Sequence, residues 1–360
     1  MNEAKHSAFK VLLAGCGGMG HHWLTLAAGF ERLRIVGLVD VQREAAEALA
    51  AKHGLPASIA FTDLAEAIDA TGADVVFDTS SPQAHHDVVT TALAHGCHVL
   101  GEKPMSDSMA EARAMVAAAQ EAQRLYAVSQ NYRYQAGARA AAAYLRRGDV
   151  GPVRELHCEF FRALHPRGFR ETMPDVLLVD MSIHHFDLSR LLSGCDGEAV
   201  QCRSWNPAHS WLAGDASAAA TFELSGGGVF TYRASWVAEG AATSWHGRWR
   251  IVCDRGTLLW DGDNALTAEV VVQPGAPRQP AVVETRPVPV TPLAFPNQAG
   301  AMQAFIDALD RGTEPETVCR DSIRSLAMVD AAVRSARAGG ERVTIDSQPS
   351  AAPARPAAAR

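Results

Sequence analysis

The chain has 360 residues, 48% of them hydrophobic and 20% charged, and its formal net charge is -7. Because this length exceeds what one ordinary hydrophobic core serves, we expect two folded domains. A mildly acidic chain without a block of Lys and Arg is not expected to bind nucleic acid or an anionic lipid surface. No stretch reaches the ~18 uninterrupted apolar residues of a membrane helix, so no membrane association is expected.

The start of the chain and its cysteines point to the cytoplasm. No apolar run precedes the first predicted strand, so no secretory signal is expected. The seven cysteines lack the paired spacing of a metal site, and we expect buried thiols in a reducing cytoplasm and no bound metal. Residues 347–360 are rich in Pro and Ala and are predicted to be a disordered tail.

From residue 10 onward, short apolar runs alternate with alanine-rich helical stretches. Strands are predicted at residues 11–15, 34–40, 59–61, 75–80, 98–103 and 125–130. Helices are predicted between them at residues 21–30, 42–53, 63–69, 82–95, 107–123 and 134–147. Apolar runs without alternation are typical of strands covered on both faces, as in a parallel sheet. The first part of the chain is therefore predicted to be a doubly wound α/β domain of the Rossmann type.

A glycine-rich segment follows the first predicted strand and opens a helix. It reads Gly15-Cys16-Gly17-Gly18-Met19-Gly20, a G-x-G-x-x-G spacing. In that context Gly15 permits a tight turn, Gly17 lets a pyrophosphate approach the backbone, and Gly20 lets helix and strand pack closely. The helix N-terminus offers N–H groups and a partial positive charge to the phosphates. The segment therefore predicts a dinucleotide-binding loop.

Asp40 stands 20 residues after Gly20, at the end of the second predicted strand. A carboxylate at this place can accept hydrogen bonds from the ribose hydroxyls of NAD. Its charge would repel the 2′-phosphate of NADP, so NAD is the favoured cofactor. Arg43 lies close enough in sequence to compensate this charge, which keeps NADP open. FAD uses the same glycine spacing and also stays an alternative.

The triplet Glu102-Lys103-Pro104 follows the fifth predicted strand, after the segments VVFDTSSPQAHH and HGCHVLGEKPM. This succession resembles the Gfo/Idh/MocA family of oxidoreductases, which includes glucose–fructose oxidoreductase and inositol dehydrogenase. The resemblance spans about residues 10–194 and is looser to about residue 338. It implies a Rossmann domain followed by an α/β domain with a large, open, mostly antiparallel sheet. We predict an NAD(P)-binding domain over residues 8–131 and a substrate-binding and oligomerisation domain over residues 132–346.

The resemblance places Lys103 in the active site, between nicotinamide and substrate. An ammonium there can hydrogen-bond the reacting oxygen and stabilise negative charge as it develops. The resemblance also implies cofactor contacts from Ser80, Pro82, His85 and Glu102. His85 could equally lie on a helix surface, where the adjacent His86 is expected. The two histidines form a poor metal site, because neighbours in a helix face different sides.

A second set of chemical side chains lies in residues 179–187, VDMSIHHFD. On a regular α-helix, Asp180, His184 and Asp187 share one face. A carboxylate one turn before a histidine can orient the imidazole and raise its pKa, which suits proton exchange; the alternative is an ordinary surface pair. The family pattern D-x-G-x-H-x-x-D matches here, with Ser182 at the glycine position. We predict His184 as general acid/base and Asp180 as a substrate ligand or orienting group.

Two further segments are expected near the substrate. Arg133 falls where relatives place an arginine whose fork could bind hydroxyl or carboxylate groups, although a surface role stays open. Residues 165–170, HPRGFR, are rich in polar groups and are predicted to border the substrate site. His185 is expected to be structural or peripheral.

From residue 153 the pattern changes to longer alternating runs. Strands are predicted at residues 153–162, 198–205, 216–224, 228–236, 248–253 and 257–260, and helices at residues 299–310 and 319–337. Alternation with glycine turns predicts an antiparallel sheet. The tryptophans between residues 205 and 260 are expected to lie mostly in the core or an interface. The resemblance implies a homodimer or homotetramer.

These features together predict reversible, NAD-dependent oxidation of a secondary alcohol on a sugar, inositol or related polyol. Lys103, Asp180 and His184 would act at the reacting oxygen. One alternative is transient oxidation that eliminates a glycosidic bond, for which Lys103 and His184 would serve equally. Another is a non-catalytic NAD-sensing sugar-binding protein, which would not need all three side chains.

Overall fold

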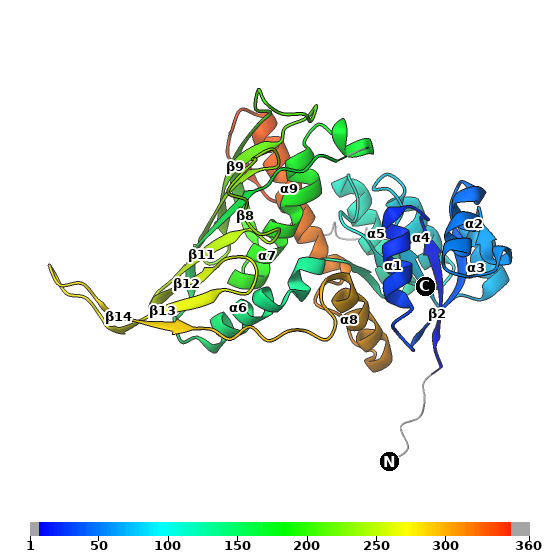
Figure 1. Cartoon of the computed structure of the whole chain (residues 1–360), viewed down its shortest axis with the longest axis horizontal. Helices are drawn as coiled ribbons and strands as arrows, with labels where there is room; N and C mark the ends of the chain where they lie inside the picture. The colour runs from blue at the N-terminus through cyan, green and yellow to red at the C-terminus, as the bar shows by residue number, and fades with distance from the viewer. Residues whose placement is uncertain (1–6, 167, 347–360) are drawn as a thin grey trace, which may run out of the picture. The chain divides into compact units, whose positions relative to one another are not determined.

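The computed structural model describes residues 7–166 and 168–346. Among them, the first compact unit contains residues 7–130 and 298–323, and the second contains residues 131–297 and 324–346 (Figure 1). Arg167 and the predicted disordered tail, residues 347–360, lie outside the described residues. Within the described part of the chain, none of the helices is apolar over a length that would span a membrane.

A six-stranded parallel sheet forms the centre of the first unit. Its strands are β1 (Phe9–Ala14), β2 (Leu33–Val39), β3 (Ala60–Phe61), β4 (Val75–Asp78), β5 (His98–Gly101) and β6 (Tyr126–Val128). They lie in the order β3-β2-β1-β4-β5-β6, which confirms the predicted doubly wound α/β fold. The strand order reverses between β1 and β4, and ligands of such sheets bind at the carboxyl ends of the strands near this point.

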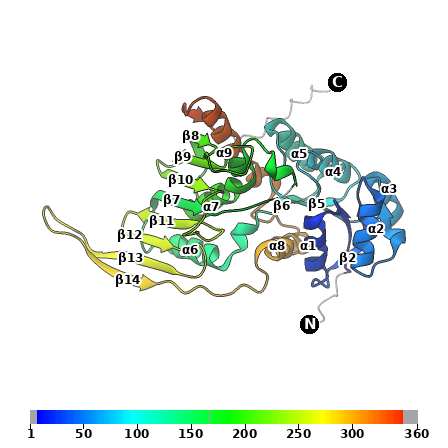
Figure 2. The same ribbon diagram turned by 45° about the horizontal axis from the view of Figure 1, so that its top comes forward.

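Helices cover the sheet of the first unit. They are α1 (Gly18–Ala27), α2 (Arg43–Lys52), α3 (Leu64–Thr71), α4 (His85–Ala94), α5 (Met109–Ala122) and most of α8 (Asn297–Arg311) (Figure 2). Phe305 of α8 shares a core with Val11 and Phe77 of the sheet. The predicted start of a helix at residue 82 is wrong: residues 81–84 form a turn, in which Ala84 N–H donates to the carbonyl of Ser81 at 2.8 Å.

A nine-stranded sheet forms the second unit. Its strands are β7 (Val153–Phe161), β8 (Gly197–Trp205), β9 (Ser217–Leu224), β10 (Val229–Ser235), β11 (Arg248–Cys253), β12 (Gly256–Trp260), β13 (Leu266–Gln273), β14 (Val282–Pro287) and β15 (Val343–Thr344). They lie in the order β14-β13-β12-β11-β7-β10-β9-β8-β15. The pair β7–β10 is parallel and the other neighbours are antiparallel, which confirms the predicted large and mostly antiparallel sheet.

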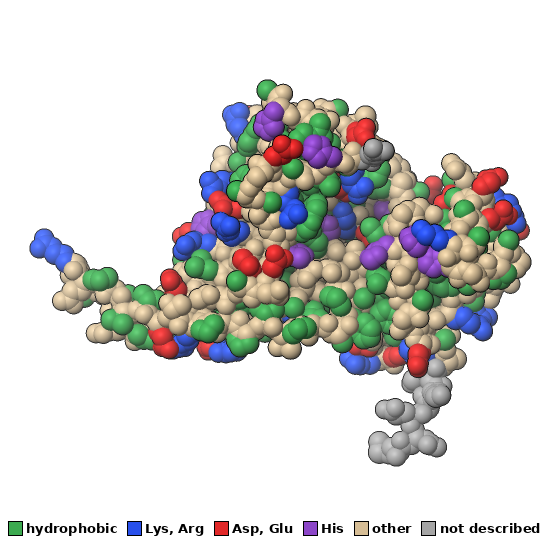
Figure 3. Space-filling view, viewed as in Figure 1, with side chains coloured by type: hydrophobic (Ala, Val, Ile, Leu, Met, Phe, Trp, Pro, Cys, Tyr) green, Lys and Arg blue, Asp and Glu red, His purple; other side chains and the backbone are tan. Residues whose placement is uncertain are grey.

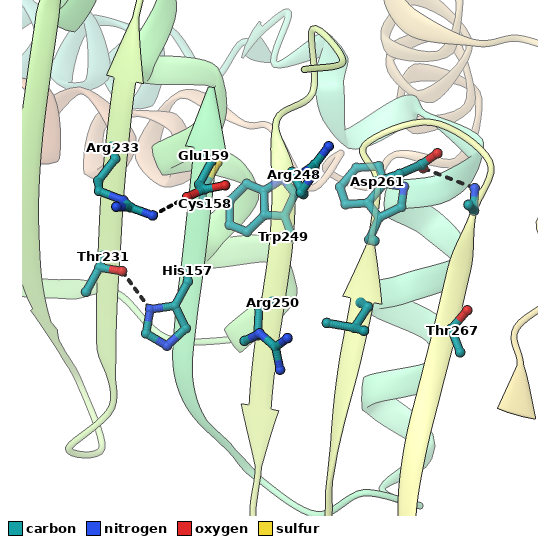
Figure 4. Close-up of a pocket in the computed structure, with 13 residues that line it drawn as sticks. His157, Cys158, Glu159, Thr231, Arg233, Arg248, Trp249, Arg250, Asp261 and Thr267 are labelled. Atoms are coloured by element: carbon teal, nitrogen blue, oxygen red, sulfur yellow. Dashed lines mark hydrogen bonds and ion pairs between the residues drawn. The ribbon is translucent and has the colours of Figure 1, made fainter. Parts of the chain in front are cut away.

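The two faces of this sheet differ. Helices α6 (Ala136–Arg147) and α7 (Ile183–Ser193) and the second-unit part of α9 (Cys319–Arg337) lie on one face (Figures 1 and 2). Along β7, Leu156, Cys158 and Phe160 are buried, whereas His157 and Glu159 point to the other face. There the His157 Nδ1 atom lies 2.7 Å from Thr231 Oγ1 of β10, so neighbouring strands present linked polar side chains (Figure 4).

The β13–β14 hairpin carries exposed hydrophobic side chains at the edge of the sheet. Val272, Val282 and Val283 each expose half of their surface. The space-filling view shows hydrophobic side chains along this projecting hairpin (Figure 3). Exposed apolar residues on an edge strand are typical of a surface that contacts a partner.

Candidate functional site

The glycine loop joins β1 to α1. Its first and last glycines are closely packed, whereas its middle glycines are open. Gly15 has φ +92, and a Cβ atom on it would lie 2.5 Å from the backbone nitrogen of Ser80. A Cβ atom on Gly20 would lie 2.1 Å from the carbonyl oxygen of Gly15. At Gly17 and Gly18, an added Cβ would meet no described atom within 4 Å. Gly15 and Gly20 therefore serve packing, whereas Gly17 and Gly18 leave the backbone open to a ligand.

The N-terminus of α1 faces this open side without a protein cap. Gly17 is the N-cap residue and provides no side chain, and the first turn of the helix contains no acidic residue. The first N–H groups of a helix lack intrahelical partners and carry a partial positive charge. These residues therefore fit the pyrophosphate of a dinucleotide. Cys16 is buried in the loop, and Met19 is 39% exposed.

Asp40 directly follows β2 and is bonded to the glycine loop. Its Oδ2 atom accepts a hydrogen bond from the N–H of Cys16 at 2.8 Å, and its Oδ1 atom accepts one from the N–H of Gln42 at 3.0 Å. Burial, together with the charge of Asp40, raises the pKa of the Cys16 thiol to about 12. Arg43 forms an ion pair with Glu47, with Nε and Oε1 at 3.0 Å. The guanidinium therefore has a carboxylate partner other than Asp40.

Asp78, the last residue of β4, organises the side chains that follow it. It is fully buried and accepts hydrogen bonds from Ser80 Oγ at 2.6 Å and from His85 Nδ1 at 2.7 Å. His85 is 1% exposed, so a surface position for this histidine is wrong; His86 is half-buried. Burial alone would lower the pKa of His85, but the charge and hydrogen bond of Asp78, together with the charges of Glu102 and Asp107, raise this pKa on balance.

Glu102 and Lys103 follow β5 at the same carboxyl edge. The N–H of Glu102 donates to the carbonyl oxygen of Asp78 at 2.8 Å, and its carboxylate accepts from Trp23 Nε1 at 2.8 Å and from the N–H of Lys103 at 3.1 Å. Burial raises the pKa of Glu102. Lys103 and Pro82 are half-buried. Thus the Ser80, His85 and Glu102 side chains are bound within the first unit, and Lys103 lies at the ligand-binding edge of its sheet.

The segment before α7 departs from the predicted regular helix. Residues Leu177–Ser182 form the π-helical segment η4, and α7 begins at Ile183. The prediction that Asp180, His184 and Asp187 follow one regular α-helix is therefore wrong, because a π-turn contains an extra residue. The Ser182 hydroxyl lies 3.0 Å from the carbonyl oxygen of Leu177 and 3.1 Å from Tyr232 Oη of β10. Ser182, at the glycine position of the family pattern, thus bonds the wide turn to the sheet.

His184 and Asp180 both lie beside Tyr132, which belongs to the short helix η2 (Asn131–Tyr134). The rings of His184 and Tyr132 stack with centroids 4.1 Å apart and an interplanar angle of 16°. The Asp180 carboxylate accepts two hydrogen bonds from Arg170 of η3 (Gly168–Glu171), at 2.6 and 3.2 Å. Burial and, to a smaller extent, the charge of Asp180 raise the pKa of Tyr132. Both Asp180 and His184 are buried, at 7% and 6% exposure.

Arg133 points elsewhere, to a buried carboxylate of α7. Its Nε and Nη2 atoms donate to Asp187 at 2.6 and 2.7 Å, and the Ser325 hydroxyl donates to the same carboxylate at 2.7 Å. The fork predicted to bind substrate thus joins η2 to α7. His185 is completely buried, 3.0 Å from Tyr232 Oη and 3.1 Å from the carbonyl oxygen of Trp245, and burial lowers its pKa to about 3.

Sequence reasoning missed several residues around Asp180 and His184. Arg170 lies in the segment predicted to border the substrate, but its pairing with Asp180 had no signal in the sequence. Tyr132 adjoins the predicted Arg133 and could have been noticed on that ground. Arg162 and Trp245 stack on each other, with the guanidinium carbon 4.6 Å from the ring centroid. They are far apart in the chain, so no local pattern could reveal the contact.

Comparisons with known proteins agree with this geometry. A family described as "Oxidoreductase family, NAD-binding Rossmann fold" matches residues 9–130, and the "GFO/IDH/MocA C-terminal domain" matches residues 138–259. Inositol 2-dehydrogenase of Streptomyces avermitilis is 28% identical, over 94% of this chain and 95% of that protein. D-apiose dehydrogenase of Paraburkholderia graminis is 27% identical, over 92% of this chain and 88% of that protein.

A solved structure shows the same fold at low sequence identity. It is an oxidoreductase from Agrobacterium radiobacter in complex with NAD⁺, L-tartaric acid and magnesium, 21% identical to this chain. The match covers 94% of this chain and 99% of that one, with a TM-score of 0.83. The first unit is thus an NAD-binding Rossmann domain. The chain belongs to the Gfo/Idh/MocA family of oxidoreductases.

Proposed function

We propose that this protein reversibly oxidises a secondary alcohol of a sugar, inositol or related polyol, with NAD as cofactor. The observation that carries the proposal is the buried group of Asp180, Tyr132 and His184 in the second unit, in a chain whose first unit binds NAD. The names of two relatives, inositol 2-dehydrogenase and D-apiose dehydrogenase, support a polyhydroxylated substrate. We propose residues 8–131 as the NAD(P)-binding domain and residues 132–346 as the substrate-binding domain; within the latter range, residues 298–323 pack as part of the first compact unit.

Each side chain has a distinct task in this reaction. His184 takes the hydroxyl proton of the substrate and returns it in the reverse direction. Lys103 donates a hydrogen bond to the same oxygen and stabilises its negative charge. Asp180, held by two hydrogen bonds from Arg170, accepts a substrate hydroxyl or orients His184. When bound, NAD supplies the acceptor for the hydride of the carbinol carbon.

The residues around the glycine loop favour NAD over NADP. We propose that Gly15, Cys16, Gly17, Gly18, Met19 and Gly20 surround the pyrophosphate. Asp40 presents a carboxylate where the ribose hydroxyls would lie, and its charge opposes a 2′-phosphate. Arg43 forms an exposed ion pair with Glu47 within α2 and is a further proposed residue of the cofactor site. Ser80, Pro82, His85 and Glu102 line or support the neighbouring edge of the site.

The test combines substrate screening with two substitutions. A panel of sugars, inositols and polyols is scored for NADH formation, and Lys103→Met and His184→Asn are compared with the parent protein. Each variant should lose about 10²–10⁴-fold in kcat while its affinity for NADH, measured by fluorescence, changes little. Because the two side chains serve one oxygen, the double variant should be scarcely worse than the poorer single variant.

Two results would contradict the proposal. Unchanged turnover in Lys103→Met would remove this residue from the reaction. Cleavage of a glycoside without net NADH formation would replace simple oxidation by redox elimination, in which the same residues serve. Matched controls are Lys52→Met, at the end of α2, and His86→Asn, in α4.

We also propose a cytoplasmic homodimer or homotetramer. All seven cysteines are free thiols, six of them buried, which suits a reducing compartment. The exposed valines of the β13–β14 hairpin and the helix-free face of the nine-stranded sheet provide surface for subunit contact (Figures 3 and 4). Light scattering on the purified protein measures the assembly, and a monomer at micromolar concentration would contradict it.

A further inference from the structure

Arg162 stands out beside the group of Asp180, Tyr132 and His184. It directly follows β7 and is two residues beyond Phe160, whose ring lies 4.8 Å from that of His185 in α7. Since side chains alternate along a strand, Arg162 extends to the same face of the sheet as α7. This is the face on which His184 lies.

The guanidinium is held in place by its surroundings. Nη1 donates to the carbonyl oxygen of Thr243 at 2.7 Å, and the guanidinium carbon lies 4.6 Å from the ring centroid of Trp245. Thr243 is itself fixed, because its N–H donates to the carbonyl of Phe161 at 2.9 Å. The backbone N–H of Arg162 donates to the carbonyl oxygen of Ser235 at 3.0 Å, and its carbonyl oxygen accepts from the N–H of Ala238 at 3.3 Å. Its position is therefore preorganised.

The ion pairs of the described residues leave the Arg162 guanidinium to a ligand. The side chain is half-buried, and among the described residues no carboxylate pairs with it. The Asp180 carboxylate forms an ion pair with Arg170, and the Asp187 carboxylate forms one with Arg133. A fixed, half-buried guanidinium that has no carboxylate partner of its own is suited to bind an anionic group of a ligand. Arg162 is also close enough to Tyr132 to oppose the rise that burial causes in the pKa of its phenol.

We propose that Arg162 binds a carboxylate of the substrate, which is therefore a polyhydroxy acid such as an aldonate rather than a neutral polyol. The planar guanidinium matches a planar carboxylate through two parallel N–H···O bonds. Trp245, 36% exposed, adds a ring surface beside it. This inference rests on the proposed function, since it places the acid group of the substrate near Tyr132 while the reacting alcohol meets His184.

The experiment measures binding and turnover separately. Aldonates of several configurations, the alditols of matching configuration and glucose 6-phosphate are titrated into the NAD-loaded protein by calorimetry, and the same compounds are assayed for NADH formation. The aldonate that binds best should exceed its alditol by about 10- to 100-fold in affinity, the worth of one charge-assisted contact. Arg162→Met should abolish this preference and leave alditol binding unchanged. Arg162→Lys should restore part of it.

The matched control is Arg250→Met, an exposed arginine of β11 on the opposite face of the sheet (Figure 4). It should retain the full preference for the acid. Stronger binding of the alditol or of glucose 6-phosphate, or no binding by any aldonate, overturns the assignment. So does an equal loss of acid and alditol binding in Arg162→Met with an unchanged melting temperature. If acids bind through Arg162 but no compound forms NADH, the proposed reaction fails while the carboxylate site stands.

Discussion

At the scale of single residues, the Asp40 carboxylate has two roles in the first unit. Asp40 accepts hydrogen bonds from the N–H groups of Cys16 and Gln42, which fixes the loop, and its negative charge faces the proposed ribose site. Asparagine removes the charge but keeps only one accepting oxygen, so one of these two hydrogen bonds is also lost.

Asp40→Asn should change cofactor choice and lower stability by no more than the loss of one hydrogen bond, about 0.5–1.5 kcal/mol. We expect the ratio of kcat/KM for NAD to that for NADP to fall by about 10- to 100-fold, because a charge-assisted contact to the ribose is lost and repulsion of the 2′-phosphate disappears. Steady-state kinetics with both cofactors measures this ratio, and urea unfolding measures the smaller loss of stability. An unaltered ratio would show that Asp40 only braces the loop. Asp69→Asn, in α3, is the control.

At the scale of elements, buried polar contacts fix α7 and the turn before it. Arg133 and Asp187 join η2 to α7, and Ser182 joins η4 to β10. These contacts hold the backbone on both sides of His184. Arg133, which was predicted to bind substrate, thus donates to Asp187 of the protein itself.

Arg133→Met tests that structural role. It would leave the buried carboxylate of Asp187 with only the longer ion pair to Arg190, at 3.7 Å, and the Ser325 hydroxyl, and should lower the free energy of unfolding by about 1.5–3 kcal/mol. The double variant Arg133→Met/Asp187→Leu should recover much of the loss, because both charges are then absent. Urea unfolding measures both values. A near-neutral single variant whose KM alone rises would instead support a substrate contact.

Ser182→Ala tests the bond across the π-turn. The Tyr232 hydroxyl and the Leu177 carbonyl would lose a buried partner, and we expect unfolding to become easier by about 1–2 kcal/mol, with a lower kcat as His184 loses its fixed backbone. Ser58→Ala, at an exposed serine of the first unit, should stay within about 0.5 kcal/mol of the parent. Equal effects of the two substitutions on both stability and kcat would remove the special role of Ser182.

At the scale of the whole molecule, buried histidines couple stability to pH. Burial lowers the pKa of His185 to about 3. The folded protein therefore keeps this side chain neutral between pH 3 and its unfolded value of about 6.5, while the unfolded chain binds a proton. The contribution of neutral His185 to the free energy of unfolding is therefore complete above pH ~6.5, and it is lost as the pH falls from there toward 3. Burial shifts the pKa of His53, His98 and His246 in the same direction.

His185→Gln should flatten the pH dependence of stability. The slope of unfolding free energy between pH 4 and pH 6 should decrease by up to about 1.4 kcal/mol per pH unit, which corresponds to one proton. Urea titrations at several pH values give the slope, whatever the absolute stability of the variant. His86→Gln, a half-buried histidine of α4, should leave the slope as it is in the parent. The same slope in His185→Gln would mean that other groups carry the dependence.

Local patterns in the sequence were enough for the Rossmann sheet, the glycine loop and the antiparallel character of the second sheet. Spacing along the chain directly sets which side chains share a face and where a turn needs glycine. Strands β13, β14 and β15 were not predicted. Strand β15 has only two residues, and β14 is an exposed edge strand, so neither shows a strong apolar pattern. Strand β13 does alternate, with Leu266, Ala268 and Val270 buried, and its pattern could have been noticed.

Tertiary structure alone decided the partners of the chemical side chains. Arg133 with Asp187, Tyr132 with His184 and Arg162 with Trp245 are each separated by many residues, and their contacts depend on how helices pack on the sheet. Motifs and hydrophobic periodicity involve only a few neighbouring positions. They can therefore be recognised along the chain, and they were enough to predict the family and the fold. Whether an arginine binds a carboxylate of the protein or awaits one from a ligand depends on distances between distant segments, which folding sets.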